Sequence, residues 1–219
     1  MTTAAENLPA HWQPIPRAFF TRPPETVAPQ LLGKLLARLT PSGWLAGRIV
    51  ELEAYLGPHS QPPDPASHSF RGPTPRNAVM FGPPGYAYVY FIYGMYFCMN
   101  VTCEPEGKAG CILVRALEPV LGREVMAVNR RLPATTPDRR LTAGPGLLCQ
   151  ALAITRPEHN GLNLLLPQSP LQLLHDGSIP AAIDITTRIG IRHAANLPLR
   201  FSIAGNPCIS RIGKAQPIV

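Results

Sequence analysis

The stretch Gly47-Arg-Ile-Val-Glu-Leu-Glu-Ala-Tyr-Leu56 decides the fold, because its apolar and polar side chains alternate with the period of a β-strand. The apolar residues on one face of this strand, which we predict to lie in the core, are Val50, Leu52, Ala54 and Leu56. The other face carries Glu51, Glu53 and Tyr55. That face is either an ordinary solvent-facing surface or a buried functional site, and alternation does not rank Glu51 against Glu53.

Strands and short helices are predicted on both sides of this strand. A helical pattern over residues 24–33 ends at Gly33, and a strand over 34–39 forms a hairpin with the strand over 44–56. The turn of this hairpin is Thr40-Pro-Ser-Gly43. Further strands are predicted over residues 86–93, 95–103, 110–117, 185–193 and 199–203, and helices over 119–130 and 144–153.

This order of elements predicts an α+β fold. We expect a single mixed domain with a curved, largely antiparallel sheet, a protruding β-hairpin and flanking helices. Residues 1–16 contain three prolines and little periodicity, so we predict a flexible N-terminal arm ahead of one domain over residues 17–219.

Residues 57–86 are predicted to form a long loop, and eight of these 30 residues are proline. A loop of this length inside a compact domain is usually functional or disordered. Proline lowers the entropy cost of ordering a chain, so we interpret the loop as an ordered wall. It contains His68 and Arg76.

Five of the six tyrosines lie between residues 86 and 96. Tyr88 and Tyr90 share a strand face and could present a stacking surface, while Tyr93 precedes Gly94 at the predicted hairpin tip. A large aromatic side chain at an exposed tip suggests insertion into a partner. The alternative is the ordinary preference of tyrosine for strands.

The composition favours a polyanionic partner and excludes several classes of protein. The chain of 219 residues has 20 Lys and Arg against 13 Asp and Glu, a net charge of +7, and 17 of the basic residues are arginine. GC-rich codon usage would also enrich arginine. The chain lacks a membrane-length apolar window and a secretory signal, so we expect an intracellular protein without membrane contact. Five cysteines without Cys-x-x-Cys spacing indicate reduced thiols rather than a zinc site.

Several motifs together resemble the alkyladenine (3-methyladenine) DNA glycosylase family, and the resemblance extends from about residue 18 to 210. The motifs are Arg48-Ile-Val-Glu-Leu-Glu-Ala-Tyr-Leu-Gly-Pro58, Thr74-Pro-Arg-Asn77, Tyr88-Val-Tyr-Phe-Ile-Tyr-Gly-Met-Tyr-Phe-Cys-Met-Asn100, Leu113-Val-Arg-Ala-Leu-Glu-Pro119, Gly144-Pro145, Leu148-Cys-Gln-Ala-Leu-Ala-Ile154 and Pro198-Leu-Arg-Phe201.

The resemblance implies a monofunctional DNA glycosylase domain that acts in base excision repair. Such an enzyme flips alkylated or deaminated purines out of double-stranded DNA and hydrolyses the N-glycosidic bond, as a monomer and without a cofactor or metal. The residues that match family roles are Glu53 as general base with Arg115 beside the water, Tyr55, His68, Tyr90 and Asn100 in the base pocket, Tyr93 as the intercalating wedge, and Thr74, Arg76 and Arg115 on the DNA backbone.

The sequence departs from the family at two places. Leu147 stands where the family often has lysine, which removes one cationic contact, and the loop around His68 differs in length and is richer in proline. Two other functions compete with the glycosylase. One is a DNA-binding module without catalysis, and the other is a metal-dependent hydrolase that uses Glu53, His59 and His68.

Overall fold

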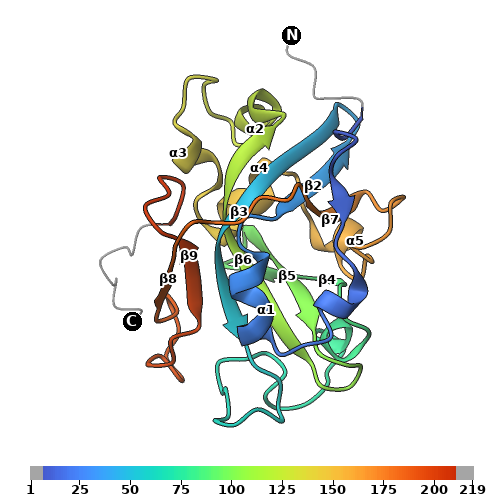
Figure 1. Cartoon of the computed structure of the whole chain (residues 1–219), viewed down its shortest axis with the longest axis vertical. Helices are drawn as coiled ribbons and strands as arrows, with labels where there is room; N and C mark the ends of the chain where they lie inside the picture. The colour runs from blue at the N-terminus through green and yellow to red at the C-terminus, as the bar shows by residue number, and fades with distance from the viewer. Residues whose placement is uncertain (1–6, 211–219) are drawn as a thin grey trace.

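A computed structural model of the chain describes residues 7–210 and is built on one antiparallel sheet (Figure 1). The sheet has nine strands, in the order β1-β7-β2-β3-β6-β5-β4, with β9 paired to β3 and β8 paired to β9. The strands are β1 (Gln13–Pro14), β2 (Leu35–Thr40), β3 (Gly43–Tyr55), β4 (Ala87–Ile92), β5 (Tyr96–Cys103), β6 (Gly110–Leu121), β7 (Leu171–His175), β8 (Ile183–Thr186) and β9 (Arg200–Ile203).

Five short helices flank the sheet, so the predicted α+β class is confirmed. They are α1 (Pro24–Leu31), α2 (Arg123–Asn129), α3 (Asp138–Thr142), α4 (Pro145–Ala151) and α5 (Arg156–His159). In Figure 1, α2 and α3 lie together at one end of the molecule, and β8 and β9 lie on the side opposite to α5. Within residues 7–210, none of the helices has the length and apolar character needed to cross a membrane.

Strand β3 organises the sheet because different strands pair with its two halves. Its first half pairs with β2 from Gly43 to Arg48, and its second half pairs with β9 from Glu51 to Glu53. Strand β6 pairs along the other edge of β3 over most of its length. The two glutamates therefore have a strand on each side, and both are fully buried. A solvent-facing surface, the alternative left open by the sequence, is ruled out.

A β-bulge interrupts the alternation in β3. Ile49 pairs with Leu117 and Glu51 with the adjacent Ala116, which leaves Val50 without a partner of its own. Val50 consequently packs against Ala116 and Cys208, whereas Leu52, Ala54 and Leu56 join the main core. The prediction that all four apolar residues share one face was therefore wrong for Val50.

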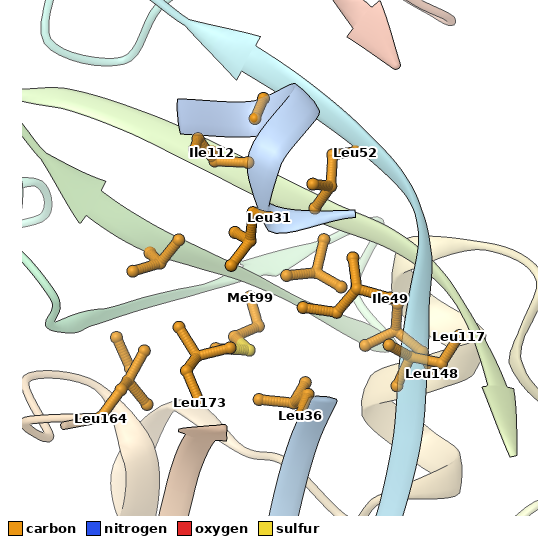
Figure 2. Close-up of a cluster of buried hydrophobic side chains, with 14 of the residues drawn as sticks. Leu31, Leu36, Ile49, Leu52, Met99, Ile112, Leu117, Leu148, Leu164 and Leu173 are labelled. Carbon is orange, nitrogen blue, oxygen red and sulfur yellow. The ribbon is translucent and has the colours of Figure 1, made fainter. Parts of the chain in front are cut away.

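The main core lies where α1, α4 and the central strands meet. Figure 2 shows the side chains that converge there from β2, β3, β5, β6, β7 and the two helices. Those labelled are Leu31, Leu36, Ile49, Leu52, Met99, Ile112, Leu117, Leu148, Leu164 and Leu173, and all are essentially without exposed surface.

The predicted hairpin forms from β4 and β5. Tyr90 pairs with Cys98 and Ile92 with Tyr96, so Tyr93, Gly94 and Met95 form its tip. Tyr93 and Gly94 have φ angles of 52° and 66°, in the left-handed region that glycine adopts without strain. The tip is apolar and open to solvent, because Tyr93 is 75% exposed and Met95 is 67% exposed.

The helix predicted from Pro119 starts later than expected. β6 continues through Pro119, which pairs with Gly47, and ends at Leu121, and α2 begins after Gly122. Strand β5 pairs with β6 only as far as Leu113, so the edge of β6 that faces away from β3 has no strand partner at Pro119 among the described residues. Proline is therefore tolerated in this part of the strand.

The strand predicted over residues 185–193 is also shorter than expected. Only Ile183–Thr186 form β8, and the chain then turns into the site described below. Of the predicted N-terminal arm, residues 1–6 lie outside the described residues. Gln13–Pro14 pair with β7 and Ile15 is buried. The domain boundary at residue 17 stays a prediction.

Candidate active site

A cavity of about 530 Å³ lies beside the base of the β4–β5 hairpin. Its wall comes from β3 to β6, the proline-rich loop, the start of α4 and residues 189–191. The predicted site residues that line it are Tyr55, His68, Tyr90, Tyr93, Asn100 and Arg115. Glu53, Thr74 and Arg76 are not part of the wall.

Glu53 lies directly behind this wall, because three groups of the wall bind it, two by hydrogen bonds and one as an ion pair. The backbone N–H of Ile189 donates to Oε1 over 2.7 Å, and Nη1 of Arg115 lies 3.1 Å from the same oxygen. The Tyr55 hydroxyl donates to Oε2 over 2.9 Å. A carboxylate oxygen has two acceptor sites, so the described residues leave one on Oε2.

Glu51 has different surroundings, although it is equally buried. Its Oε1 accepts from Nε of Arg115 (3.0 Å), Nε of Arg200 (2.7 Å) and the Ser210 hydroxyl (2.7 Å), and its Oε2 accepts from the Ser210 backbone N–H (2.6 Å). Arg200 and Ser210 do not line the cavity. The geometry thus separates two acids that alternation could not rank, since only Glu53 is held by cavity residues alone.

The charges of this network stabilise one another. Burial acts to raise the pKa of Glu51, but Arg115 and the hydrogen bonds from Ser210 and Arg200 outweigh it and hold that pKa below its ordinary value. Burial acts to lower the pKa of Arg115, and the charges of Glu53 and Glu51 outweigh it and raise that pKa. Arg115 therefore bridges both carboxylates as a permanent cation.

The observed partners of Arg115 lie within the chain. The resemblance implied that this arginine lies beside the water and on the DNA backbone, and the structure shows ion pairs with Glu51 and Glu53. Arg115 is only 7% exposed, although it reaches the cavity wall. Its role on the DNA backbone stays a prediction.

Three aromatic rings form one side of the cavity. Nδ1 of His68 and the hydroxyl of Tyr88 are 2.9 Å apart, and the centroids of the His68 and Tyr90 rings are 4.7 Å apart. Burial raises the pKa of Tyr88 to about 12, and burial and Arg76 lower that of His68, so both rings are neutral at pH 7. Tyr88 was not among the predicted pocket residues, although its place on the same strand face as Tyr90 pointed to it.

Both polar atoms of the Asn100 side-chain amide are held by hydrogen bonds. Its Nδ2 donates to the backbone oxygen of Tyr88 over 3.0 Å, and the Cys111 thiol donates to its Oδ1 over 3.8 Å. The side chain is 3% exposed and lines the cavity. These two contacts set which end of the amide is the donor and which is the acceptor.

The proline-rich loop is held by Asn77, which the sequence did not single out. Its Nδ2 donates to the backbone oxygens of His68 (2.7 Å) and Gly72 (3.1 Å), and its Oδ1 accepts from the Thr74 N–H (2.6 Å). Thr74 and Arg76 are exposed beside the cavity. The Arg76 guanidinium lies over the Tyr90 ring, 5.7 Å from its centroid.

Residues 187–191 are the part of the site that sequence analysis missed. Arg188 forms a buried ion pair with Asp64 of the proline-rich loop, and the next residue, Ile189, donates to Glu53. Gly190, with a φ of 74°, turns the chain along the cavity wall. The available signal was Gly190 inside the strand predicted over residues 185–193, because a glycine within a strand pattern often marks an irregularity of the backbone.

Leu147 lines the cavity from α4 together with Pro145 and Gly146. The side chain at position 147, where the resemblance led us to expect lysine, is therefore an apolar part of the wall. Within residues 7–210, no group of three His, Cys, Asp or Glu side chains is arranged to hold a metal ion. The groups that contact Glu53 are N–H and O–H hydrogen-bond donors. Such donors bind a carboxylate but do not help it to bind a metal ion.

Comparison with known proteins places the chain in one family. A sequence model of the methylpurine-DNA glycosylase (MPG) family matches residues 18–207. A protein of Koribacter versatilis is 53% identical over 201 residues, which are 92% of this chain and 95% of that protein. Proteins of Burkholderia lata and Methanoculleus marisnigri are 48% and 47% identical, over 90% of this chain and 90% and 98% of their own lengths.

All three relatives are assigned by name as 3-methyladenine DNA glycosylases, and their names mark the assignment as provisional. The family model spans almost all of the described chain, from before α1 to beyond β9. This chain therefore belongs to the methylpurine-DNA glycosylase family, whose members hydrolyse the N-glycosidic bond.

Proposed function

We propose that this enzyme excises alkylated and deaminated purines that have been flipped out of duplex DNA, with Glu53 activating the attacking water. The observation that carries the proposal is the position of Glu53. Its carboxylate lies behind the wall of the cavity, is held by three groups of that wall, and keeps one acceptor site on Oε2. A base must leave the helical stack before its C1′ can meet this site.

In this mechanism, the water enters between Glu53, Arg115 and the 187–191 segment. Glu53 is 0% exposed in the structure, so its contact with Tyr55 or Ile189 must open to admit the water. A shift of the Tyr55 ring that moves its hydroxyl away from Oε2 would make room for the water. Glu53 then takes a proton from the water, which attacks C1′ as the bond to the base breaks.

Electrostatics favour the same step. Positive charge develops on the sugar as the glycosidic bond breaks, and a fixed carboxylate in a buried site stabilises that charge. Arg115 holds the carboxylate in place, and its own charge is shared with Glu51. In family terms Arg115 is the second catalytic residue, and here it acts by orienting Glu53 and the water.

The cavity wall suits a flat and polarisable base. Tyr55, His68 and Tyr90 present π surfaces, and a methylated, cationic purine gains about 0.5–2 kcal/mol from a cation–π contact. Neutral His68 and Tyr88 can also accept hydrogen bonds from a deaminated purine or donate hydrogen bonds to it. Asn100 lines the cavity and is proposed to exclude the exocyclic amine of normal guanine.

The β4–β5 hairpin supplies the wedge in this proposal. Tyr93 is 75% exposed at the tip and also lines the cavity, so its ring can occupy the gap left by a flipped base. Thr74 and Arg76 are exposed beside the cavity and are proposed to contact the DNA backbone. The enzyme is further proposed to work inside the cell as a monomer.

Replacing Tyr93 with serine should weaken flipping, because the hydroxymethyl group cannot offset the loss of stacking. We expect a loss of about 1–3 kcal/mol, which is a drop of about 5- to 150-fold in the flipping equilibrium, on the scale of aromatic stacking on a base. Fluorescence of 2-aminopurine placed beside the lesion measures it, and Tyr93→Phe should remain close to the wild type. Equal flipping by all three proteins would contradict the wedge.

The proposal as a whole is tested by base release from duplexes that each hold one lesion. We expect free 3-methyladenine, 7-methylguanine and hypoxanthine to be released, with an intact abasic strand left behind. Among residues 7–210 no lysine lines the cavity, so a Schiff base and strand cleavage are not expected. A DNA-binding module without catalysis would bind the same duplexes and release no base. Unchanged release in EDTA would dismiss the metal-dependent hydrolase.

A further inference from the structure

A buried ion pair lies directly behind Tyr55. Nη1 and Nη2 of Arg188 are each 2.7 Å from a carboxylate oxygen of Asp64, and neither side chain is exposed. Nη1 also donates to the backbone oxygen of Ala54 over 3.0 Å. The Asp64 carboxylate in turn accepts from the backbone N–H of Leu56. The pair therefore joins the proline-rich loop, β3 and the 187–191 segment at one point.

The same guanidinium covers one face of the Tyr55 ring. Its central carbon lies 4.6 Å from the ring centroid. Nε of Arg188 is buried and has no hydrogen-bond partner among the described residues, so one of its N–H groups is not engaged by Asp64 or Ala54. Because Arg188 is buried, the ring face beneath it is closed to a base, and only the rest of Tyr55 borders the cavity.

We infer that Arg188 determines lesion specificity by lowering the preference of the pocket for cationic purines relative to neutral ones. The inference rests on the proposed function, in which the flipped base stacks on Tyr55. An aromatic ring attracts a cation through the negative potential of its faces. A permanent cation fixed on one face partly cancels the negative potential of the ring. The ring therefore attracts a second cation on its cavity side less strongly.

The neighbouring charges do not remove this effect. Asp64 binds the Nη atoms of Arg188, whereas the central carbon is the part that lies over the ring. Glu53 accepts from the Tyr55 hydroxyl and favours any cationic base, but it is also bound to Arg115. Glu53 and Arg115 stay in place when Arg188 is changed, so their contribution is common to all of the variants below.

The test replaces the ion pair as a unit, because a buried charge left alone is strongly destabilising. In Asp64→Asn/Arg188→Gln both charges are lost, and the asparagine oxygen can still accept from Leu56. In Asp64→Asn/Arg188→Met an apolar side chain replaces the cation. This second double variant is measured if the first one does not fold. Arg188→Lys keeps a cation over the ring and changes only the hydrogen-bond geometry.

The measurement is the ratio of kcat/KM for 7-methylguanine, a cationic lesion, to kcat/KM for hypoxanthine, a neutral one, in the same duplex. The ratio should rise roughly five- to tenfold in a folded double variant, on the scale of one cation–π contact, and should stay within about twofold of the wild type in Arg188→Lys. A merely structural role would lower both rates equally. An unchanged ratio in an active double variant, or an equal rise in Arg188→Lys, overturns the inference and leaves the proposed function intact. No base release by the wild type overturns both.

Discussion

Replacing Glu53 with glutamine is expected to lower single-turnover excision of 3-methyladenine by about 10²–10⁴-fold, the usual contribution of a general base. The amide has nearly the shape of the carboxylate, and its oxygen can still accept from Ile189 and Arg115. The Tyr55 hydroxyl can turn to accept from the new amide nitrogen. The buried network loses one negative charge, which will lower the stability, but Glu51 still pairs with Arg115 and Arg200, so the fold and the DNA surface should survive while the proton acceptor is lost.

Two measurements separate lost chemistry from lost structure in this variant. Thermal unfolding should show a folded protein, and fluorescence anisotropy should show an affinity for lesion DNA close to that of the wild type. Raising the pH should restore part of the rate, because hydroxide can then attack without the help of a general base. If single-turnover excision stays within threefold of the wild type, Glu53 is not the general base.

Replacing Glu51 with glutamine should destabilise the fold by about 3–5 kcal/mol, because a buried ion network that loses one partner leaves uncompensated charge. Glu51 is the shared acceptor of Arg115 and Arg200 and also binds Ser210. An amide cannot balance two buried guanidinium groups. Urea unfolding measures the loss, and the exposed Glu158, which pairs with Arg38 at the surface, gives the control, with less than about 1 kcal/mol expected for Glu158→Gln.

The same residue predicts a pH dependence of the stability. The pKa of Glu51 is lower in the folded protein than its ordinary value of 4.5, so the folded state releases this proton more readily than the unfolded chain. Its stabilising effect is present above about pH 4.5 and is lost as the pH falls through the folded pKa. The difference in unfolding free energy between wild type and Glu51→Gln should thus shrink below about pH 4.5. A difference that stays constant down to pH 3 would contradict the role assigned to Glu51.

Local sequence signals predicted most of the sheet and failed where distant segments meet. The hairpin of β2 and β3 and the pair β4 and β5 follow from alternation and turn residues between neighbouring segments. The bulge at Val50 could not be predicted, because it reflects the register with β6, more than 60 residues away in the chain. Likewise, the local sequence around Pro119 favours a helix start. The strand continues through this proline because β6 has no strand partner there on the side away from β3.

The candidate site also was predicted from local motifs, and its contacts between distant segments were missed. Motif resemblance identified Glu53, Tyr55, Tyr90, Asn100 and Arg115, and five tyrosines in one short stretch pointed to an aromatic wall. The contact between Ile189 and Glu53 joins residues 136 positions apart, and the pair of Asp64 and Arg188 joins residues 124 apart. No periodicity encodes such contacts. Burial of two glutamates needs both β6 and β9 beside β3, which only the assembled sheet provides.

The enclosure of Glu53 has a consequence for the proton balance of each turnover. A cationic purine leaves as a neutral base, so in the proposed reaction the proton taken from water is left over on Glu53. The groups around that carboxylate form the cavity wall, and the proton must therefore depart through the space that the excised base occupies. A neutral purine needs a proton as it leaves and carries this one away. The same active site is thus reset by solvent after one class of lesion and by the product itself after the other.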